Sequence, residues 1–166
     1  MTQELVVGQN IVHRRYGAGT VVKVRKGLED EEHQSYYVID IPSGELKVHL
    51  PADSSQDMNL RRLASKRKMI KAMQTLSAET AELPRDYRER RTLISEFLGE
   101  GSVTSLARVI RDLVGLKSRK SLSTLESTWL TDAKRRLAGE LALVVDIDLT
   151  EAMQRLEQAL HKPEGE

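Results

Sequence analysis

The feature that most constrains the fold is a change of hydrophobic period near Pro51. Before it, apolar and polar residues alternate in short runs rich in Val, Ile, Tyr and Thr, a pattern typical of β-strands. After about residue 65, apolar residues recur every three or four positions, which is typical of amphipathic helices. The chain therefore cannot form one uniform sheet or one uniform bundle. The pattern predicts a β part followed by an α part.

The first part predicts four short strands, at residues 10–13, 20–26, 35–41 and 45–50. Turn chemistry separates them, in Tyr16-Gly17-Ala18-Gly19, in the acidic loop Glu29-Asp30-Glu31-Glu32 and in Pro42-Ser43-Gly44. Strands this short within about fifty residues can hardly form two layers, so we expect one curled sheet, a small SH3-like or Tudor-like barrel. The fold class predicted for the chain is α+β, with the barrel first and an all-α domain after it.

The second part predicts five helices with recognisable start signals. They are expected over about residues 65–78, from Pro84 to about Leu98, from a Ser102 cap to Gly115, from a Ser123–Glu126 capping box through Val144, and from Asp148 through Leu160. The predicted division is a barrel over residues 1–55, a linker over 56–64, a helical domain over 65–161 and a frayed tail over 162–166. Trp129 lies near the apolar stripe of the longest helix, and we expect it in the core.

Composition and motifs exclude several classes of function. The 166 residues include no cysteine, which excludes disulfide bonds, thiolate catalysis and cysteine-ligated zinc sites. The four histidines lack metal-ligand spacing, and P-loop, dinucleotide and nucleophile-elbow motifs are absent. We therefore expect no enzyme, no metal and no cofactor. The chain also has neither a secretory signal nor an apolar run of bilayer length, so no membrane partner and a cytoplasmic location are expected.

The near-neutral net charge of +1 conceals a basic middle. Residues 58–120 carry fifteen Lys and Arg against seven Asp and Glu, whereas residues 1–57 carry six against nine. The excess falls in three groups: Arg61, Arg62, Lys66, Arg67, Lys68 and Lys71; then Arg85, Arg88, Arg90 and Arg91 around Tyr87; then Arg108, Arg111, Lys117, Arg119 and Lys120. Arginines interleaved with an aromatic suit phosphate contact and base stacking. Three groups in one helical domain favour a shared nucleic-acid face, although each alone is also typical of a solvated helix surface.

Two sets of short segments carry a resemblance to a known family. Val7 to His13, Tyr16 to Gly19, Tyr36 to Val38 and Val48 to Pro51 resemble the RNA-polymerase-interacting domain of the bacterial CarD/CdnL transcription regulators, a module that also occurs in the transcription-repair coupling factor. Pro84 to Arg91, Leu98 to Ser102, Leu106 to Leu113, Leu122 to Glu126 and Ala133 to Leu143 resemble the helical domain of the same regulators. The segments follow the family's order over nearly the whole chain.

The resemblance implies a Tudor-like domain that binds the β subunit of RNA polymerase, and a helical domain that contacts promoter DNA at the upstream edge of the transcription bubble. There, a tryptophan of the family enters the minor groove and holds the melted state open. Aligned on Pro84 and the arginines after it, this chain has Tyr87 at that position, and Glu89 and Thr92 where basic residues are common. The residues implied in DNA contact are Tyr87, Arg85, Arg88, Arg90, Arg91, Arg111, Lys117, Arg119 and Lys120.

The N-terminal half is acidic and therefore poorly suited to binding DNA. We expect it to bind the protein partner instead. An exposed strand can add to a partner's sheet, and we expect the polymerase-binding edge at Leu46, Lys47, Val48 and His49. The hypothesis is thus a non-catalytic, monomeric regulator that stabilises the open complex between RNA polymerase and the promoter. Two other interpretations also fit the residues: an RNA- or ribosome-associated small-barrel module, and a protein adaptor that makes no DNA contact.

Overall fold

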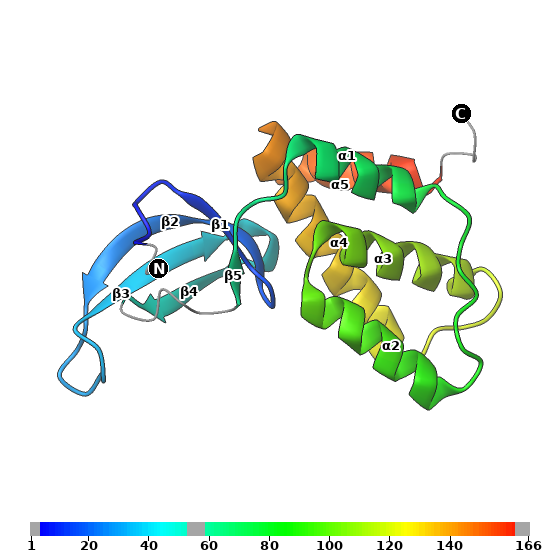
Figure 1. The fold of residues 1–166 in the computed structure, drawn as a ribbon, viewed down its shortest axis with the longest axis horizontal. Coiled ribbons are helices and arrows are strands. Elements are labelled where there is room, and N and C mark those ends of the chain that lie inside the picture. The colour runs from blue at the N-terminus through cyan, green and yellow to red at the C-terminus, as the bar shows by residue number, and fades with distance from the viewer. Residues whose placement is uncertain (1–3, 53–58, 162–166) are drawn as a thin grey trace.

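The computed structural model describes residues 4–52 and 59–161, which form a curved sheet beside a set of helices (Figure 1). The strands described are β1 (Asn10–His13), β2 (Gly17–Lys26), β3 (Ser35–Ile41), β4 (Leu46–Pro51) and β5 (Leu60–Arg61). All neighbours are antiparallel, in the order β4-β3-β2-β1-β5. The predicted α+β fold is confirmed, with the barrel as a five-stranded half-barrel. Because β5 lies within residues 56–64, the sheet continues into the predicted linker.

Strand β2 bends, and its bend gives the sheet its curvature. The register against β3 shifts between Val21 and Lys23, which is the signature of a β-bulge. The turn predicted over Tyr16 to Gly19 is displaced, because the described turn lies at residues 14–16 and β2 already begins at Gly17, whose φ of +115° favours glycine. A Cβ atom on Gly19 would lie 2.3 Å from the carbonyl oxygen of Asp40, so only glycine permits this approach. One face of the sheet encloses a small core of Leu5, Ile11, Val21, Tyr37, Ile39 and Ile41.

The described helices are α1 (Lys66–Leu76), α2 (Tyr87–Glu100), α3 (Val103–Lys117), α4 (Thr124–Val145) and α5 (Leu149–Leu160). A 3-10 turn, η1 (Pro42–Gly44), joins β3 to β4. Three predicted start signals are confirmed, because Ser102, Ser123 and Asp148 each accept a backbone N–H from the first turn of α3, α4 and α5. Ser123 and Glu126 form the complete capping box.

Two predicted helix boundaries are wrong. Helix α2 begins after Pro84, because the carboxylate of Asp86 accepts the N–H groups of Arg88 and Glu89 and so caps the helix. Gly115 does not end α3, which continues to Lys117. Its role is close packing instead, since a Cβ atom there would lie 2.6 Å from Cγ2 of Thr80. The glycine that ends a helix is Gly101, with φ at +63° after α2.

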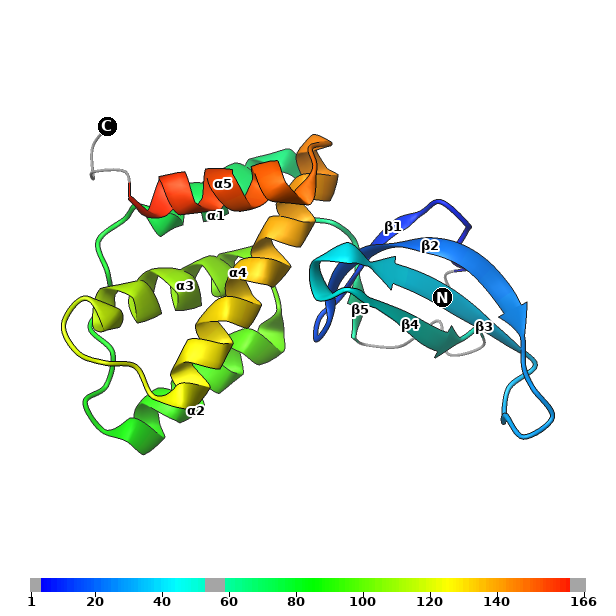
Figure 2. The ribbon, with the colours of Figure 1, turned by 180° about the vertical axis from the view of Figure 1, so that it is seen from behind.

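Helix α3 lies between α1 and α2, and α4 crosses behind it toward the sheet (Figures 1 and 2). Helices α1 and α5 lie side by side. The start of α2, the end of α3 and the start of α4 share the end of the helical half that is farthest from the sheet. The large side chains fully buried in this half include Met69, Ile94, Leu106, Ile110, Leu113, Leu137 and Leu156.

A buried ion pair joins the helical half to the sheet. Glu140 of α4 is 1% exposed and accepts two hydrogen bonds from Arg61 of β5, at 2.8 and 2.5 Å. It also accepts the N–H of Ala64 at 2.8 Å, and Arg61 donates to the carbonyl oxygen of Gly101 at 2.8 Å. We call the contacts of Arg61 and Glu140 the joint. They connect β5, α4 and the end of α2, and so fix the two halves relative to one another.

A second buried arginine reinforces this connection. Arg136 of α4 donates to the carbonyl oxygens of Arg14 and Leu98, and it pairs with Asp132 at 3.4 Å. Burial lowers the pKa of the Arg136 guanidinium, and Asp132 opposes that shift. The turn between β1 and β2 is thereby tied to both α2 and α4.

Candidate functional site

Strand β4 forms one edge of the sheet, since it pairs with β3 and with no other described strand. The N–H of Ala52 donates to the carbonyl oxygen of Ser35 at 3.0 Å, and hydrogen-bonded pairs alternate along an antiparallel ladder. By that alternation the N–H of Val48 points toward β3, whereas the backbone groups of Lys47 and His49 point outward. The edge therefore offers outward donors and acceptors on which a strand of another chain can add.

The side chains of β4 alternate in burial. Leu46 and Val48 pack against the small core of the sheet, while Lys47 and His49 are exposed. His49 is held in place, because its Nδ1 accepts a hydrogen bond from Nε of Arg25 at 2.8 Å. The four residues predicted to bind polymerase thus lie on an edge strand, with Lys47 and His49 supplying its outward backbone groups.

Arg25 also pairs with the acidic loop. Its guanidinium makes two hydrogen bonds to the carboxylate of Glu31, at 2.7 and 2.8 Å, and lies 4.3 Å from the centroid of the Tyr36 ring. The hydrogen bond from Arg25, with a further one from the N–H of Leu28, lowers the pKa of Glu31 to about 2. The sequence indicated a turn here; the structure adds an ion pair that supports His49.

Tyr87 lies at the other end of the molecule, as the first residue of α2. Its side chain is 41% exposed. The Arg90 guanidinium carbon lies 5.5 Å from the centroid of the Tyr87 ring, within cation–π range. The ring therefore rests on a cation on one side while it remains accessible to solvent.

The prediction that Arg90 contacts DNA is corrected by its burial. Arg90 is 3% exposed, and its Nε donates to Glu126 of α4 at 2.5 Å. The same guanidinium donates to the carbonyl oxygens of Pro84 and Arg85, at 3.2 and 3.3 Å. Arg90 thus holds the segment before α2 against the start of α4, and through the ring contact it supports Tyr87.

Glu126 remains ionised in this buried pair. Burial opposes its negative charge, but hydrogen bonds from Arg90 and Ser123 outweigh that cost and lower the pKa of Glu126. Because Glu126 is also the acidic member of the α4 capping box, one carboxylate organises the starts of both α2 and α4.

The other predicted DNA-binding residues divide into two kinds. Six are exposed and belong to segments at the end of the helical half farthest from the sheet (Figures 1 and 2): Arg85, Arg88 and Arg91 at the start of α2, Lys117 at the end of α3, and Arg119 and Lys120 in the connection to α4. Arg111 differs, because its side chain is 13% exposed and pairs with Asp112 at 2.8 Å. Asp112 also accepts the N–H of Ala81 at 3.0 Å, so this pair anchors the connection between α1 and α2. The assignment of Arg111 to the DNA surface is corrected accordingly. We call the six exposed residues and Tyr87 the basic end.

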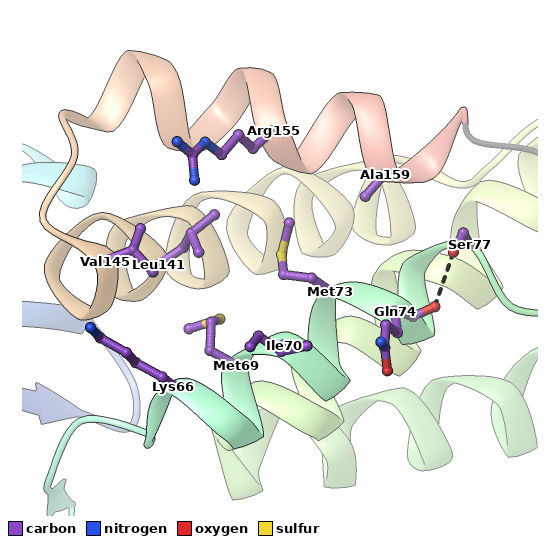
Figure 3. A pocket seen from close by; sticks show the side chains of 10 residues that line it. All are labelled: Lys66, Met69, Ile70, Met73, Gln74, Ser77, Leu141, Val145, Arg155 and Ala159. Atoms are coloured by element: carbon purple, nitrogen blue, oxygen red, sulfur yellow. Dashed lines mark hydrogen bonds between the residues drawn. The ribbon is translucent and has the colours of Figure 1, made fainter. Parts of the chain in front are cut away.

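The first basic group of the sequence does not join the basic end. Its residues from Lys66 to Lys71 lie on α1, which is separated from α2 by α3 (Figure 1). Helix α1 forms one wall of an apolar groove of about 410 Å³ against α4 and α5. Figure 3 shows Met69, Met73, Leu141 and Val145 at this groove. Helices α1 and α2 pack on opposite sides of α3, so the first basic group lies apart from the start of α2 (Figure 1).

One cluster was missed by the sequence reasoning. Arg14, Arg15 and Tyr16 lie in the turn between β1 and β2 and line a cleft together with Trp129 of α4. Trp129 packs against the helical core but is only half-buried, so its predicted place in the core is correct only in part. The turn places two arginines beside an aromatic, which is the pattern of residues 85–91. That pattern in the sequence indicates a second candidate site for phosphate and base contact. The contact between this turn and α4 could not be predicted from the sequence, because it depends on how the two halves pack.

The described residues contain neither a candidate metal cluster nor a candidate membrane-spanning helix. Across residues 4–52 and 59–161, no three His, Asp or Glu side chains gather closely enough to hold a metal ion. In the same ranges no helix has both the length and the apolar character that crossing a bilayer requires.

The fold and these surfaces define a two-part protein with an exposed edge strand in its β half and a basic end in its helical half. Residues 5–64 match the CarD-like/TRCF RID domain, the module that interacts with RNA polymerase, and residues 71–157 match the CarD C-terminal domain. The chain therefore belongs to the CarD-like family of transcription factors, as its resemblance predicted. It is 26% identical over 141 residues to the "Putative transcription factor YdeB" of Bacillus subtilis (strain 168), with 85% of this chain and 92% of that protein covered.

Proposed function

We propose that the protein binds the β subunit of RNA polymerase through the outward edge of β4 and stabilises the promoter open complex through Tyr87. The observation that carries the proposal is the exposed ring of Tyr87, supported by the buried Arg90–Glu126 pair, at the end of the molecule remote from β4. In this account the protein acts as a cytoplasmic monomer. The polymerase supplies promoter recognition, so the factor needs only a docking edge, phosphate contacts and a wedge.

The contact with polymerase rests on backbone groups. Edge-strand addition uses main-chain hydrogen bonds, and the outward groups of Lys47 and His49 supply them. Membership of the CarD-like family supports an interaction with polymerase, and the exposed edge supports this strand as its site.

The contact with DNA rests on side chains. Arg88 and Arg91 are exposed near Tyr87 and suit phosphates, while the ring suits stacking against a base at a distorted step. Stacking of an aromatic side chain on a base contributes about 1–3 kcal/mol. That amount corresponds to between about fivefold and a little over a hundredfold in the lifetime of a complex.

The test is the half-life of a promoter open complex, measured with factor at concentrations that saturate polymerase. We expect Tyr87→Ala to shorten the half-life by between about fivefold and a hundredfold, and Tyr87→Trp to lengthen it, because indole offers a larger stacking surface. The melting temperature of Tyr87→Ala should stay near that of the unchanged protein, since the side chain is 41% exposed. Unchanged half-lives in both variants would contradict the wedge, and so would a large loss of fold stability in Tyr87→Ala.

A further inference from the structure

A cleft of about 550 Å³ lies where the sheet meets the helices, away from both surfaces described above. The residues that matter here are Arg14, Arg15 and Tyr16 of the β1–β2 turn, Leu98 near the end of α2, and Trp129 and Asp132 of α4. The cleft draws on both halves of the chain. Arg136 ties its walls together through the carbonyl oxygens of Arg14 and Leu98, so the cleft is preformed.

The charges in the cleft favour an anion. Among the described residues that line it, Asp132 is the only acidic one, and it is already paired with the buried Arg136. The Nε of Arg14 is buried without a hydrogen-bond partner among the described residues. Arg15 is exposed and forms no ion pair in the described part of the chain; its guanidinium carbon lies 5.6 Å from the centroid of the Tyr16 ring. Two cations are thus available here without a carboxylate to satisfy them.

The aromatic side chains in the cleft indicate that the ligand also has a flat ring. Tyr16 is 39% exposed, and its ring is held by that of His13 at a centroid distance of 4.7 Å. Trp129 is half-buried and lines the same cleft. A ligand that satisfies both the arginines and the aromatics carries a negative charge beside a flat ring, which is the chemistry of a nucleotide.

We propose that this junction cleft binds an unpaired nucleotide of a DNA strand, with the phosphate on Arg14 and Arg15 and the base stacked on Tyr16, in the cleft that Trp129 also lines. The proposal rests on the proposed function in one respect, because the melted promoter is the source of unpaired strand. The cleft is a separate subsite from Tyr87. Leu98 follows Tyr87 by eleven residues on α2, which is roughly 17 Å along a helix.

The protein carries its own reporter, because Trp129 is the only tryptophan in the chain. The experiment titrates the full-length protein with the tetranucleotide dT4 and follows Trp129 fluorescence. Deoxythymidine monophosphate and inorganic phosphate serve as separate arms. We expect dT4 to change the emission in a saturable and salt-sensitive way, and the two small molecules to do so only at much higher concentration.

Variants decide whether the signal comes from the cleft. Arg15→Glu and Tyr16→Ala should each weaken dT4 binding at least about tenfold, whereas the matched charge change Lys68→Glu, on exposed α1, should not. Tyr87→Ala should leave dT4 binding at Trp129 unchanged, so failure here is distinguishable from failure of the wedge. No fluorescence response to dT4, a response that survives both cleft variants, or equal affinity for the monophosphate and dT4 would overturn the proposal.

Discussion

The outward edge of β4 and the basic end around Tyr87 differ in the atoms that they offer. The edge presents backbone N–H and carbonyl groups of Lys47 and His49, which every non-proline residue carries. The basic end presents a particular ring and particular guanidinium groups, held by the buried Arg90–Glu126 pair. The edge should therefore tolerate side-chain substitution and respond to proline, whereas the basic end should respond to single side-chain changes.

The two regions also differ in how they are connected to the rest of the chain. The edge belongs to a small sheet whose position is fixed by the Arg61–Glu140 joint. Tyr87 belongs to the helical half, which contains Glu140, the other partner of that joint. A factor that docks at one end and acts at the other needs such a connection. The joint should matter to function although it touches neither surface.

The largest effect is expected from breaking the joint. Arg61→Ala leaves Glu140 buried without its cation, and removing one partner of a buried pair costs about 3–5 kcal/mol. At about 2–4 °C per kcal/mol for a chain of this size, the melting temperature should fall by roughly 6–20 °C. Differential scanning calorimetry measures the shift.

The neighbour Arg62 supplies the matched control, because it is exposed and its loss should cost less than about 0.5 kcal/mol. The double variant with Arg61→Ala and Glu140→Gln should be more stable than Arg61→Ala alone, since the uncompensated charge has been removed. Equal melting temperatures for Arg61→Ala and Arg62→Ala would show that the joint contributes little.

A smaller effect is expected in the salt dependence of duplex binding. If Arg91 contacts a phosphate, Arg91→Ala should reduce the slope of log affinity against log salt by about 0.9. Arg67 is also exposed but belongs to α1, on the other side of α3, so Arg67→Ala should leave the slope unchanged. Fluorescence anisotropy of a labelled duplex over a salt series gives both slopes. Equal reductions would assign α1 to the same DNA surface as the basic end and contradict their separation.

The smallest effect concerns the ion pair between Arg25 and Glu31, which supports His49 on the β4 edge. The Glu31 carboxyl has its pKa lowered from an ordinary 4.5 to about 2. A lowered pKa in the folded state means that the pair stabilises the protein above pH 4.5, and that this contribution is lost as the pH falls from about 4.5 to about 2. Carboxyl ¹³C NMR should follow Glu31 through this range. Arg25→Ala should return its pKa toward 4.5, and a pKa that stays near 2 would exclude Arg25 as the main cause.

The sequence predicted the elements whose signals are local. Ser102, Ser123 and Asp148 were identified as caps because a cap depends on residues within one turn of its helix. The two-part α+β architecture followed from hydrophobic period in the same way. Exposure of Tyr87 was also consistent with its position at the start of a helix.

Features that depend on packing between distant segments could not be predicted. In the local sequence Arg90 looks like Arg88 and Arg91, yet its side chain is buried because it pairs with Glu126. That partner lies 36 residues further along the chain, so the local sequence does not reveal it. By sequence, Arg61 belongs to a basic run typical of a solvated surface. In the structure it instead forms an ion pair with Glu140, which lies 79 residues away. Gly115 resembled a helix end because the approach of Thr80 is not visible in the local sequence.

The central claim is that polymerase binding depends on the backbone of the β4 edge and is separate from the basic end. Its most direct test is the affinity of three variants for the isolated β subunit of RNA polymerase, with folding checked by circular dichroism. We predict that Lys47→Pro weakens binding at least about tenfold, since each lost hydrogen bond is worth about 0.5–1.5 kcal/mol and the proline ring also blocks the edge. Lys47→Ala and Tyr87→Ala should bind as the unchanged protein does. Full affinity in a folded Lys47→Pro variant, or loss of affinity in Tyr87→Ala, would contradict the account.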